Sequence, residues 1–150
     1  MLEIERKFLV AKDKWDEVLK SSFASISQAY IVNSKEKTVR IRIKDTKAFL
    51  TIKGETKGVT RTEFEFEIPV NQAISMLEIF QLKVLKKKRF EIWFKNTLWE
   101  VDVFEDGLSG LIIAEVELET EEATYEKPSW IGEEVSHLPE YYNANLISRL

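Results

Sequence analysis

The stretch Leu2-Glu3-Ile4-Glu5-Arg6-Lys7-Phe8 begins the chain with apolar and charged residues in alternation. In a β-strand, successive side chains point to opposite faces, so Glu3, Glu5 and Lys7 would share one face and the apolar residues would lie largely on the other. Two carboxylates and an ammonium group in one row are unsuited to an apolar core. The row therefore predicts one wall of a polar cavity that binds a metal ion and an anion.

Size and composition indicate a single globular domain over residues 1–150. Charged residues make up 32% of the chain, against about a quarter in ordinary domains. The formal net charge of −4 argues against general binding to nucleic acid or to a membrane surface. We expect a small-molecule ligand, no nucleic-acid or membrane partner, and a monomer or homodimer.

The residue types that are missing narrow the chemistry. The chain has no cysteine, which excludes disulfides, thiolate nucleophiles and cysteine-type zinc sites, and His137 is the only histidine. Multi-histidine metal sites and most Ser-His arrangements are therefore excluded. There is no run of about 18 apolar residues and no basic and apolar leader at the start, so the expected location is cytoplasmic. Any catalysis must use carboxylates, Lys, Arg, Tyr, Ser or Thr.

Alternation of polar and apolar residues recurs along the chain and predicts eight strands. Their ranges are 2–8, 25–33, 38–44, 48–53, 60–68, 84–94, 97–104 and 111–119. Connections of hairpin length favour an antiparallel meander that closes into a barrel. The predicted fold class is α+β, mainly β: a closed eight-stranded antiparallel β-barrel with helices packed on the outside. Such a barrel has room for side chains and one small ligand.

Short amphipathic segments between and after the strands predict the helices. The first covers residues 13–20 with Asp13 as N-cap, and the second covers 72–80 with Asn71 as N-cap. A third helical candidate lies at residues 139–149.

The charged strand faces allow two arrangements. They can be solvated while the apolar faces form the core, or they can line a wet tunnel while the apolar faces point outward under the helices and the tail. Segregation of the charges by strand favours the tunnel, with Glu115 and Glu117 on the wall opposite the first strand and Glu100 on the outer face. The acidic rows are Glu3/Glu5, Glu63/Glu65, Asp102 and Glu115/Glu117, and the basic rows are Arg40/Arg42, Lys53 and Lys87/Arg89.

The spacing within these rows suits a metal ion and a polyphosphate. Residues two apart on a strand are separated by about 6.5–7 Å, so two glutamates can approach one divalent ion. Two arginines at that spacing can bind neighbouring phosphoryl groups in bidentate fashion. Burial of so many charges is unfavourable unless they pair or hold ions.

The motifs together resemble those of the CYTH superfamily, the triphosphate tunnel metalloenzymes. Glu3-Ile4-Glu5-Arg6-Lys7 fits the ExExK signature of that family, and the similarity continues in order to the end of the chain. The later matching segments are Arg40-Ile41-Arg42, Thr51-Ile52-Lys53, Arg61-Thr62-Glu63-Phe64-Glu65, Lys87-Lys88-Arg89, Trp99-Glu100-Val101-Asp102, Glu115-Val116-Glu117-Leu118, Trp130-Ile131-Gly132 and Tyr141-Tyr142-Asn143-Ala144-Asn145-Leu146.

The resemblance implies a tunnel that holds a triphosphate with one or two divalent cations, and the short bacterial branch is similar to inorganic triphosphatases. At Ser136, His137 and Glu140 the tail departs from that branch, so a role of the C-terminal helix in closing the tunnel or contacting substrate stays open.

The roles that we expect from this resemblance and from the charge pattern fall into three groups. Binding of Mg²⁺ or Mn²⁺ is assigned to five carboxylates, because hard oxygen ligands suit these ions. They are Glu3, Glu5, Asp102, Glu115 and Glu117. Phosphate binding is assigned to Lys7, Arg40, Arg42, Lys53, Lys87 and Arg89. Catalytic roles are assigned to Lys7, Glu63 and Glu65, with Lys7 as either a phosphate ligand or a general base.

Three alternatives to inorganic triphosphate hydrolysis follow from the same residues. An ATP-cyclising enzyme of this fold would need an adenine pocket, for which Tyr30, Trp93 or Phe104 could stack. A thiamine or nucleoside triphosphatase would use the same charged rows. A non-catalytic module that binds polyphosphate or nucleotide would not need so many carboxylates.

Overall fold

The computed structural model describes residues 1–20 and 22–150. Its strands are β1 (Leu2–Val10), β2 (Phe23–Asn33), β3 (Lys37–Lys44), β4 (Lys47–Gly54), β5 (Thr60–Ile68), β6 (Leu85–Phe94), β7 (Thr97–Phe104), β8 (Ile112–Glu117) and β9 (Ile131–Glu134). Its helices are α1 (Lys12–Asp16), α2 (Val70–Ile79) and α3 (Asn143–Leu146), with short 3₁₀ helices η1 (Asp106–Leu108), η2 (Pro139–Tyr141) and η3 (Ile147–Arg149).

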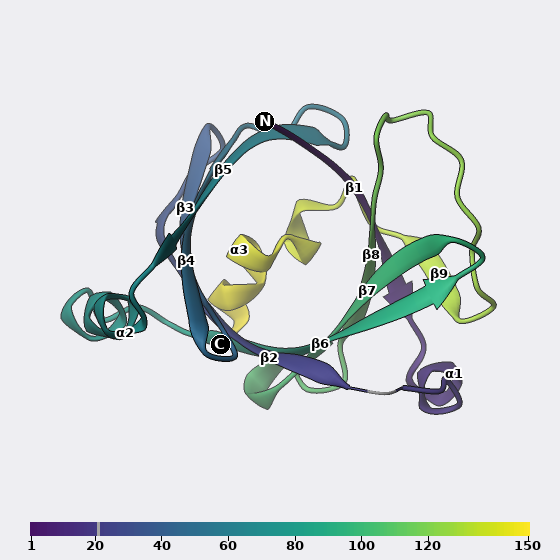
Figure 1. The fold of residues 1–150 in the computed structure, drawn as a ribbon, viewed down its shortest axis with the longest axis horizontal. Coiled ribbons are helices and arrows are strands. Elements are labelled where there is room, and N and C mark those ends of the chain that lie inside the picture. The colour runs from purple at the N-terminus through teal and green to yellow at the C-terminus, as the bar shows by residue number, and fades with distance from the viewer. Residues whose placement is uncertain (21) are drawn as a thin grey trace.

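One antiparallel sheet closes on itself to form the barrel. The strand order is β5-β4-β3-β2-β6-β7-β8-β1, and β5 pairs in turn with β1, which completes the ring seen in Figure 1. The first residues of β1 pair with β5, where Glu3 lies opposite Arg61, while its middle pairs with β8, where Glu5 lies opposite Glu117. The predicted closed eight-stranded antiparallel barrel is confirmed.

The predicted strands match the observed ones closely, but two placements were wrong. Residues 131–134 form β9, which pairs with the end of β1. This four-residue strand was missed because it is too short to show alternation. Strand β8 was expected on the wall opposite β1, yet the two are direct neighbours, because the sheet that starts at β5 ends with β8 paired to the first strand of the chain.

The helices differ more from the prediction than the strands do. Helix α1 starts after Ala11 and ends at Asp16, so Asp13 lies in the first turn and is not the N-cap. Helix α2 begins after Pro69, and Asn71 accepts a hydrogen bond from the Gln72 amide inside the first turn. The C-terminal candidate is three short pieces, η2, α3 and η3, separated by single-residue or direct junctions.

Apolar outer faces of the barrel are covered in two places. On one side, the outward residues Phe8, Trp99 and Val101 pack with Trp15 from α1 and Trp130 from the tail. On the other, α2 lies over β3 and β4 in a second cluster that contains Ile41, Ala48 and Ala73. In Figure 1 both helices lie outside the ring. This confirms the outward orientation of the apolar faces on which the tunnel prediction depends.

One end of the barrel interior is apolar and is filled by the C-terminal segment. Leu85 and Phe104 lie on the same strand faces as Lys87 and Asp102, and they form a cluster with Ile113 and Leu146. In Figure 1 α3 lies within the outline of the ring. The expectation that all helices pack outside is therefore wrong for α3, whose apolar side chain Leu146 plugs the interior.

Across the described parts of the chain, 1–20 and 22–150, every helix is too short or too polar to span a bilayer.

Candidate active site

The ring of strands divides into an acidic half and a basic half. Strands β5, β1, β8 and β7 are consecutive in the sheet and carry all the strand glutamates that line the cavity, while β4, β3 and β6 carry most of the cations. The other lining cations are Lys7 on β1, Arg61 on β5 and Lys35 in the connection between β2 and β3. Opposite charges meet in register at the two boundaries, where Lys53 faces Glu63 and Arg89 faces Asp102.

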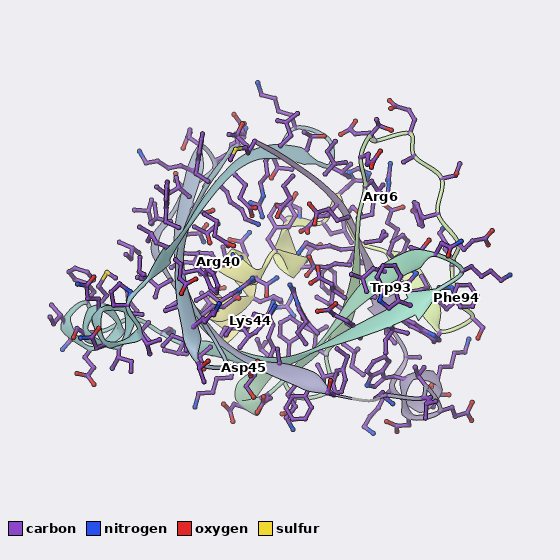
Figure 2. All side chains as sticks on the ribbon, in the orientation of Figure 1. Arg6, Arg40, Lys44, Asp45, Trp93 and Phe94 are labelled. Atoms are coloured by element: carbon purple, nitrogen blue, oxygen red, sulfur yellow. The ribbon has the colours of Figure 1, made fainter. Side chains whose placement is uncertain are left out.

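These side chains surround a cavity of about 600 Å³ inside the barrel. Its volume lies within the usual range for small-molecule sites, roughly 300–1,000 Å³. The side chains crowd the interior of the ring in Figure 2, and Arg40 lies on its inner side. The solvated-face arrangement is therefore excluded in favour of the tunnel.

At the boundary between β4 and β5, Lys53 binds three oxygens of the acidic half. Its Nζ donates to both carboxylate oxygens of Glu3 at 2.9 Å and lies 3.3 Å from Glu63 Oε2. Arg61 Nε also donates to Glu3, at 3.3 Å. Burial opposes ionisation of Glu3, but the two cations outweigh it and lower the pKa of this carboxyl to about 2.

Lys7 lies among the carboxylates of the acidic half. Its Nζ is 3.6 Å from Glu5 Oε1 and 3.7 Å from Glu115 Oε2. Burial disfavours its charge, yet the attraction of Glu115 and Glu5 prevails and raises the pKa of Lys7. The ammonium form is therefore stabilised, which is the wrong direction for a general base.

A buried pair of cations shares Asp102 at the other boundary. Lys87 Nζ donates to Asp102 Oδ2 at 2.7 Å, and Arg89 donates to both carboxylate oxygens at 2.7 and 2.8 Å. Asp102 is fully buried, and although burial opposes its charge, Arg89 and Lys87 hold its pKa far below the usual value. Burial also lowers the pKa of Lys87 to about 7.

Arg42 is a cation without a carboxylate in the part of the chain that the structure describes. Its Nε and Nη2 both donate to Gln28 Oε1, at 3.1 and 3.0 Å. Burial and the nearby charges of Arg40 and Arg89 lower the pKa of Arg42 to about 10. On the same strand, Arg40 Nε is buried with no hydrogen-bond partner among the described residues. Such groups indicate a place for an anion.

The carboxylates near the mouth crowd one another. Glu5 and Glu117 lie directly opposite on neighbouring strands. Burial and the charges of Glu3, Glu5 and Glu100 raise the pKa of Glu117, and burial together with Glu5 raises the pKa of Glu115. These negative charges repel one another, and a bound cation would offset the repulsion.

Every predicted site residue lies in or directly behind the cavity, and sequence reasoning missed three that belong with them. Glu100 was placed on the outer face but lines the cavity and accepts a hydrogen bond from Arg89 at 3.2 Å. Glu100 is two residues from Asp102 on the same strand, so the two side chains share a face, and this alternation could have revealed its position. Gln28 and Asn143 are uncharged, so the charge pattern gave no signal for either.

The chain matches the model of the CYTH domain over residues 1–150. It belongs to the CYTH domain family. Two curated CYTH relatives are named inorganic triphosphatase. The protein of Acetivibrio thermocellus is 42% identical over 146 residues, which cover 97% of this chain and 92% of the relative. That of Nitrosomonas europaea is 34% identical over 150 residues, with 97% of each chain covered.

Solved structures agree with the CYTH assignment. A crystal structure described as an inorganic triphosphatase superposes with a TM-score of 0.67 at 31% identity, covering 97% of this chain and 93% of the other. A protein from Pyrococcus horikoshii OT3 superposes with a TM-score of 0.59 at 23% identity, covering 80% of this chain and 81% of the other. The second likeness concerns the fold alone.

Proposed function

We propose that this protein hydrolyses inorganic triphosphate to pyrophosphate and phosphate with the help of a divalent cation. The observation that carries the proposal is Arg42, a largely buried guanidinium that has only an amide oxygen as partner among the described residues. A guanidinium without a carboxylate partner binds a phosphoryl group readily, because the phosphoryl group both accepts bidentate hydrogen bonds and neutralises its charge. The curated relatives named as inorganic triphosphatases support this choice of anion.

The basic half of the barrel is the proposed triphosphate site. Its cations line the cavity from β3, β4 and β6: Arg40, Arg42, Lys53, Lys87 and Arg89. Lys7 contributes an ammonium group from the acidic half, where its raised pKa keeps it charged. We assign Lys7 to phosphate binding rather than to proton abstraction for this reason.

The acidic half is the proposed cation site. Among residues 1–20 and 22–150, no three Asp, Glu or His side chains stand in a ready-made metal cluster. The donors nevertheless fit the ion, because oxygen ligands without histidine or cysteine suit Mg²⁺ or Mn²⁺. The raised pKa values of Glu115 and Glu117 fit it too, since they record crowding of negative charge. We assign Glu3, Glu5, Glu115 and Glu117 as the groups that would hold it.

We remove Asp102 from the proposed metal ligands. Both of its oxygens already accept hydrogen bonds from Lys87 and Arg89, and the residue is fully buried. Exchange of these bonds for a metal contact would take from Lys87 the carboxylate it is bonded to and from Arg89 its two shortest carboxylate bonds. Asp102 instead fixes the positions of the two cations toward the substrate.

Hydrolysis requires positioning and charge neutralisation more than covalent chemistry. A water oxygen attacks the terminal phosphorus, the bond from that phosphorus to the bridging oxygen breaks, and pyrophosphate leaves. A bound divalent cation would neutralise charge on the phosphoryl oxygens. We assign Glu63 and Glu65 to orientation of the attacking water. Burial and the neighbouring Glu3 raise the pKa of Glu63, which makes it a better proton acceptor than an ordinary glutamate.

The test is a phosphate-release panel over inorganic triphosphate, thiamine triphosphate, ATP and pyrophosphate, each with Mg²⁺, with Mn²⁺ and with excess chelator. We expect the highest kcat/KM for inorganic triphosphate and no release with chelator. Preferential turnover of ATP to a cyclic product would establish a cyclase instead. Binding of triphosphate without turnover under any metal condition would establish a binding module.

A further inference from the structure

Asn143, the first residue of α3, contacts Lys87, a fully buried cation of the site. Its side-chain oxygen accepts a hydrogen bond from Lys87 Nζ at 2.9 Å and a second, from Gln28 Nε2, at 3.3 Å. Gln28 is fully buried and binds Arg42 through its own side-chain oxygen. A continuous chain of hydrogen bonds therefore joins Arg42 to Lys87 through two amide side chains.

The orientation of both amides is fixed by the cations. An ammonium or guanidinium group can only donate hydrogen bonds, so the atom that faces Lys87 must be the oxygen of Asn143, and the atom that faces Arg42 must be the oxygen of Gln28. The amide nitrogen of Asn143 is consequently on the side away from Lys87. It has no hydrogen-bond partner among the residues described, while Asn143 itself lines the cavity.

We propose that Asn143 is a substrate-binding residue whose side-chain NH₂ group donates to the phosphoryl group bound by Lys87 and Arg42. The proposal rests on the proposed triphosphate function and adds the C-terminal helix to the substrate site. Its physical basis is that the amide is held against Lys87 and is linked through Gln28 to Arg42, so its two N–H donors are fixed close to groups that attract a phosphoryl oxygen. Hydrogen bonds to a charged group are also stronger than those between neutral groups.

The C-terminal segment offers a matched control two residues further on. Asn145 lines the same cavity, but both ends of its amide are occupied: its nitrogen donates to the Pro139 carbonyl at 2.9 Å, and its oxygen accepts from Asn33 at 3.1 Å. The substitution Asn145→Ala therefore disturbs the anchoring of α3 without removing a free donor.

The experiment compares steady-state hydrolysis of inorganic triphosphate with Mg²⁺ by wild type, Asn143→Ala and Asn145→Ala, with melting temperatures measured alongside. We expect Asn143→Ala to raise KM by about ten- to hundredfold, the range for a hydrogen bond to a charged group. Asn145→Ala should leave KM within about twofold of wild type while lowering the melting temperature. An unchanged KM for Asn143→Ala, with wild type active, overturns the proposal. No turnover by wild type would instead contradict the proposed function.

A second comparison separates direct contact from an effect through Lys87. In the Lys87→Met background, Asn143→Ala should still raise KM several-fold, because the amide donor is lost independently of the ammonium. If Asn143→Ala has no further effect in that background, Asn143 acts only by holding Lys87, and the proposed contact is wrong. If Asn143→Ala does not fold, Asn143→Asp replaces it, since the carboxylate keeps the acceptor for Lys87 and removes both donors. A KM like that of wild type for Asn143→Asp would likewise overturn the proposal.

Discussion

At the scale of single residues, the site depends on how each buried charge is compensated. Asp102 neutralises Lys87 and Arg89 through three hydrogen bonds of 2.7–2.8 Å. Arg42 lies nearby without a carboxylate partner among the described residues and so has charge to share with a ligand. Loss of Asp102 should therefore chiefly lower stability, whereas loss of Arg42 should chiefly weaken substrate binding.

Replacement of Asp102 by alanine should destabilise the protein strongly. It leaves two buried cations without their shared counter-ion, and removal of one partner from a buried ion pair typically costs about 3–5 kcal/mol. Unfolding in urea measures the change. Asp16→Ala is the control, because Asp16 pairs with Lys12 at the surface and its loss should have little effect. Equal stabilities of the two variants would show that Asp102 is not the required counter-ion.

Replacement of Arg42 by alanine should affect binding much more than stability. The guanidinium is largely buried near Arg40 and Arg89, so its removal relieves repulsion in the free protein. We expect KM for inorganic triphosphate to rise at least tenfold while the melting temperature changes little. Arg42 would have no part in the site if the kinetic constants of the variant matched those of wild type.

At the scale of secondary-structure elements, the C-terminal segment is as important as any strand. Leu146 of α3 is fully buried against Leu85, Phe104 and Ile113 at the closed end of the barrel. The segment thus both plugs the interior and presents Asn143 to the cavity.

Leu146→Ala should lower the free energy of unfolding by about 2–5 kcal/mol, the usual range for loss of a large buried aliphatic side chain. Leu150→Ala is the matched control, because Leu150 is 37% exposed at the end of the same segment and should lose much less. Equilibrium denaturation of both variants makes the comparison. A small loss at Leu146 would mean that α3 is not an integral part of the barrel core.

Strand β9 is attached to β1 by an ion pair outside the barrel. Arg6 Nη1 lies 2.8 Å from Glu134 Oε2. The Ser136 hydroxyl donates to the same oxygen at 2.7 Å and also accepts a hydrogen bond from the backbone amide of Lys7. Burial opposes the charge of Glu134, but the hydrogen bonds from Ser136 and Arg6 and the charge of Arg6 together outweigh it and lower the pKa of Glu134 below the usual 4.5. Arg6, which lies between the cavity-lining residues Glu5 and Lys7, therefore helps to hold the tail.

This pKa shift predicts a pH-dependent contribution to stability. Because the folded-state pKa of Glu134 is lower than the unfolded value, its stabilising effect is present above pH 4.5 and is lost as the pH falls below it. Glu134→Gln should therefore be less stable than wild type at pH 7, and the difference should shrink in acid. Melting curves from pH 3 to 7 provide the check, and a difference that grows in acid would be contrary to expectation.

The strands could be predicted from sequence and the tail could not, for physical reasons that particular residues illustrate. In Thr60–Ile68 every second residue is charged and the residues between them are threonine or apolar, so the bounds of this strand were predicted to the residue. The tail gains its order from contacts with distant residues, such as Asn33 with the carbonyl of Ala144 at 3.1 Å. Charge patterns likewise located Arg42 and Lys87 but not the neutral amides of Gln28 and Asn143 that connect them.

At the scale of the whole molecule, the sheet order separates the charges into two halves. The acidic strands β7 and β8 follow one another in the chain, whereas β1 and β5 come from its first half; the sheet order places β1 beside β8, and closure of the barrel places β5 beside β1. Opposite charges meet at the two boundaries and offset part of the cost of burial. A complex of a divalent cation with triphosphate has the matching distribution, positive toward the carboxylates and negative toward the basic strands.

Our proposal for the whole molecule is that this divided cavity hydrolyses triphosphate with a cation held by its acidic half. Its most direct test is Mg²⁺-dependent phosphate release from inorganic triphosphate by wild type and Glu117→Gln. Glu117 lies among other carboxylates that raise its pKa, so the substitution relieves repulsion and should leave the melting temperature intact.

We expect wild type to release phosphate only when Mg²⁺ is present and folded Glu117→Gln to be at least about a hundredfold slower. Full activity of Glu117→Gln, or turnover by wild type in excess chelator, would contradict the proposal.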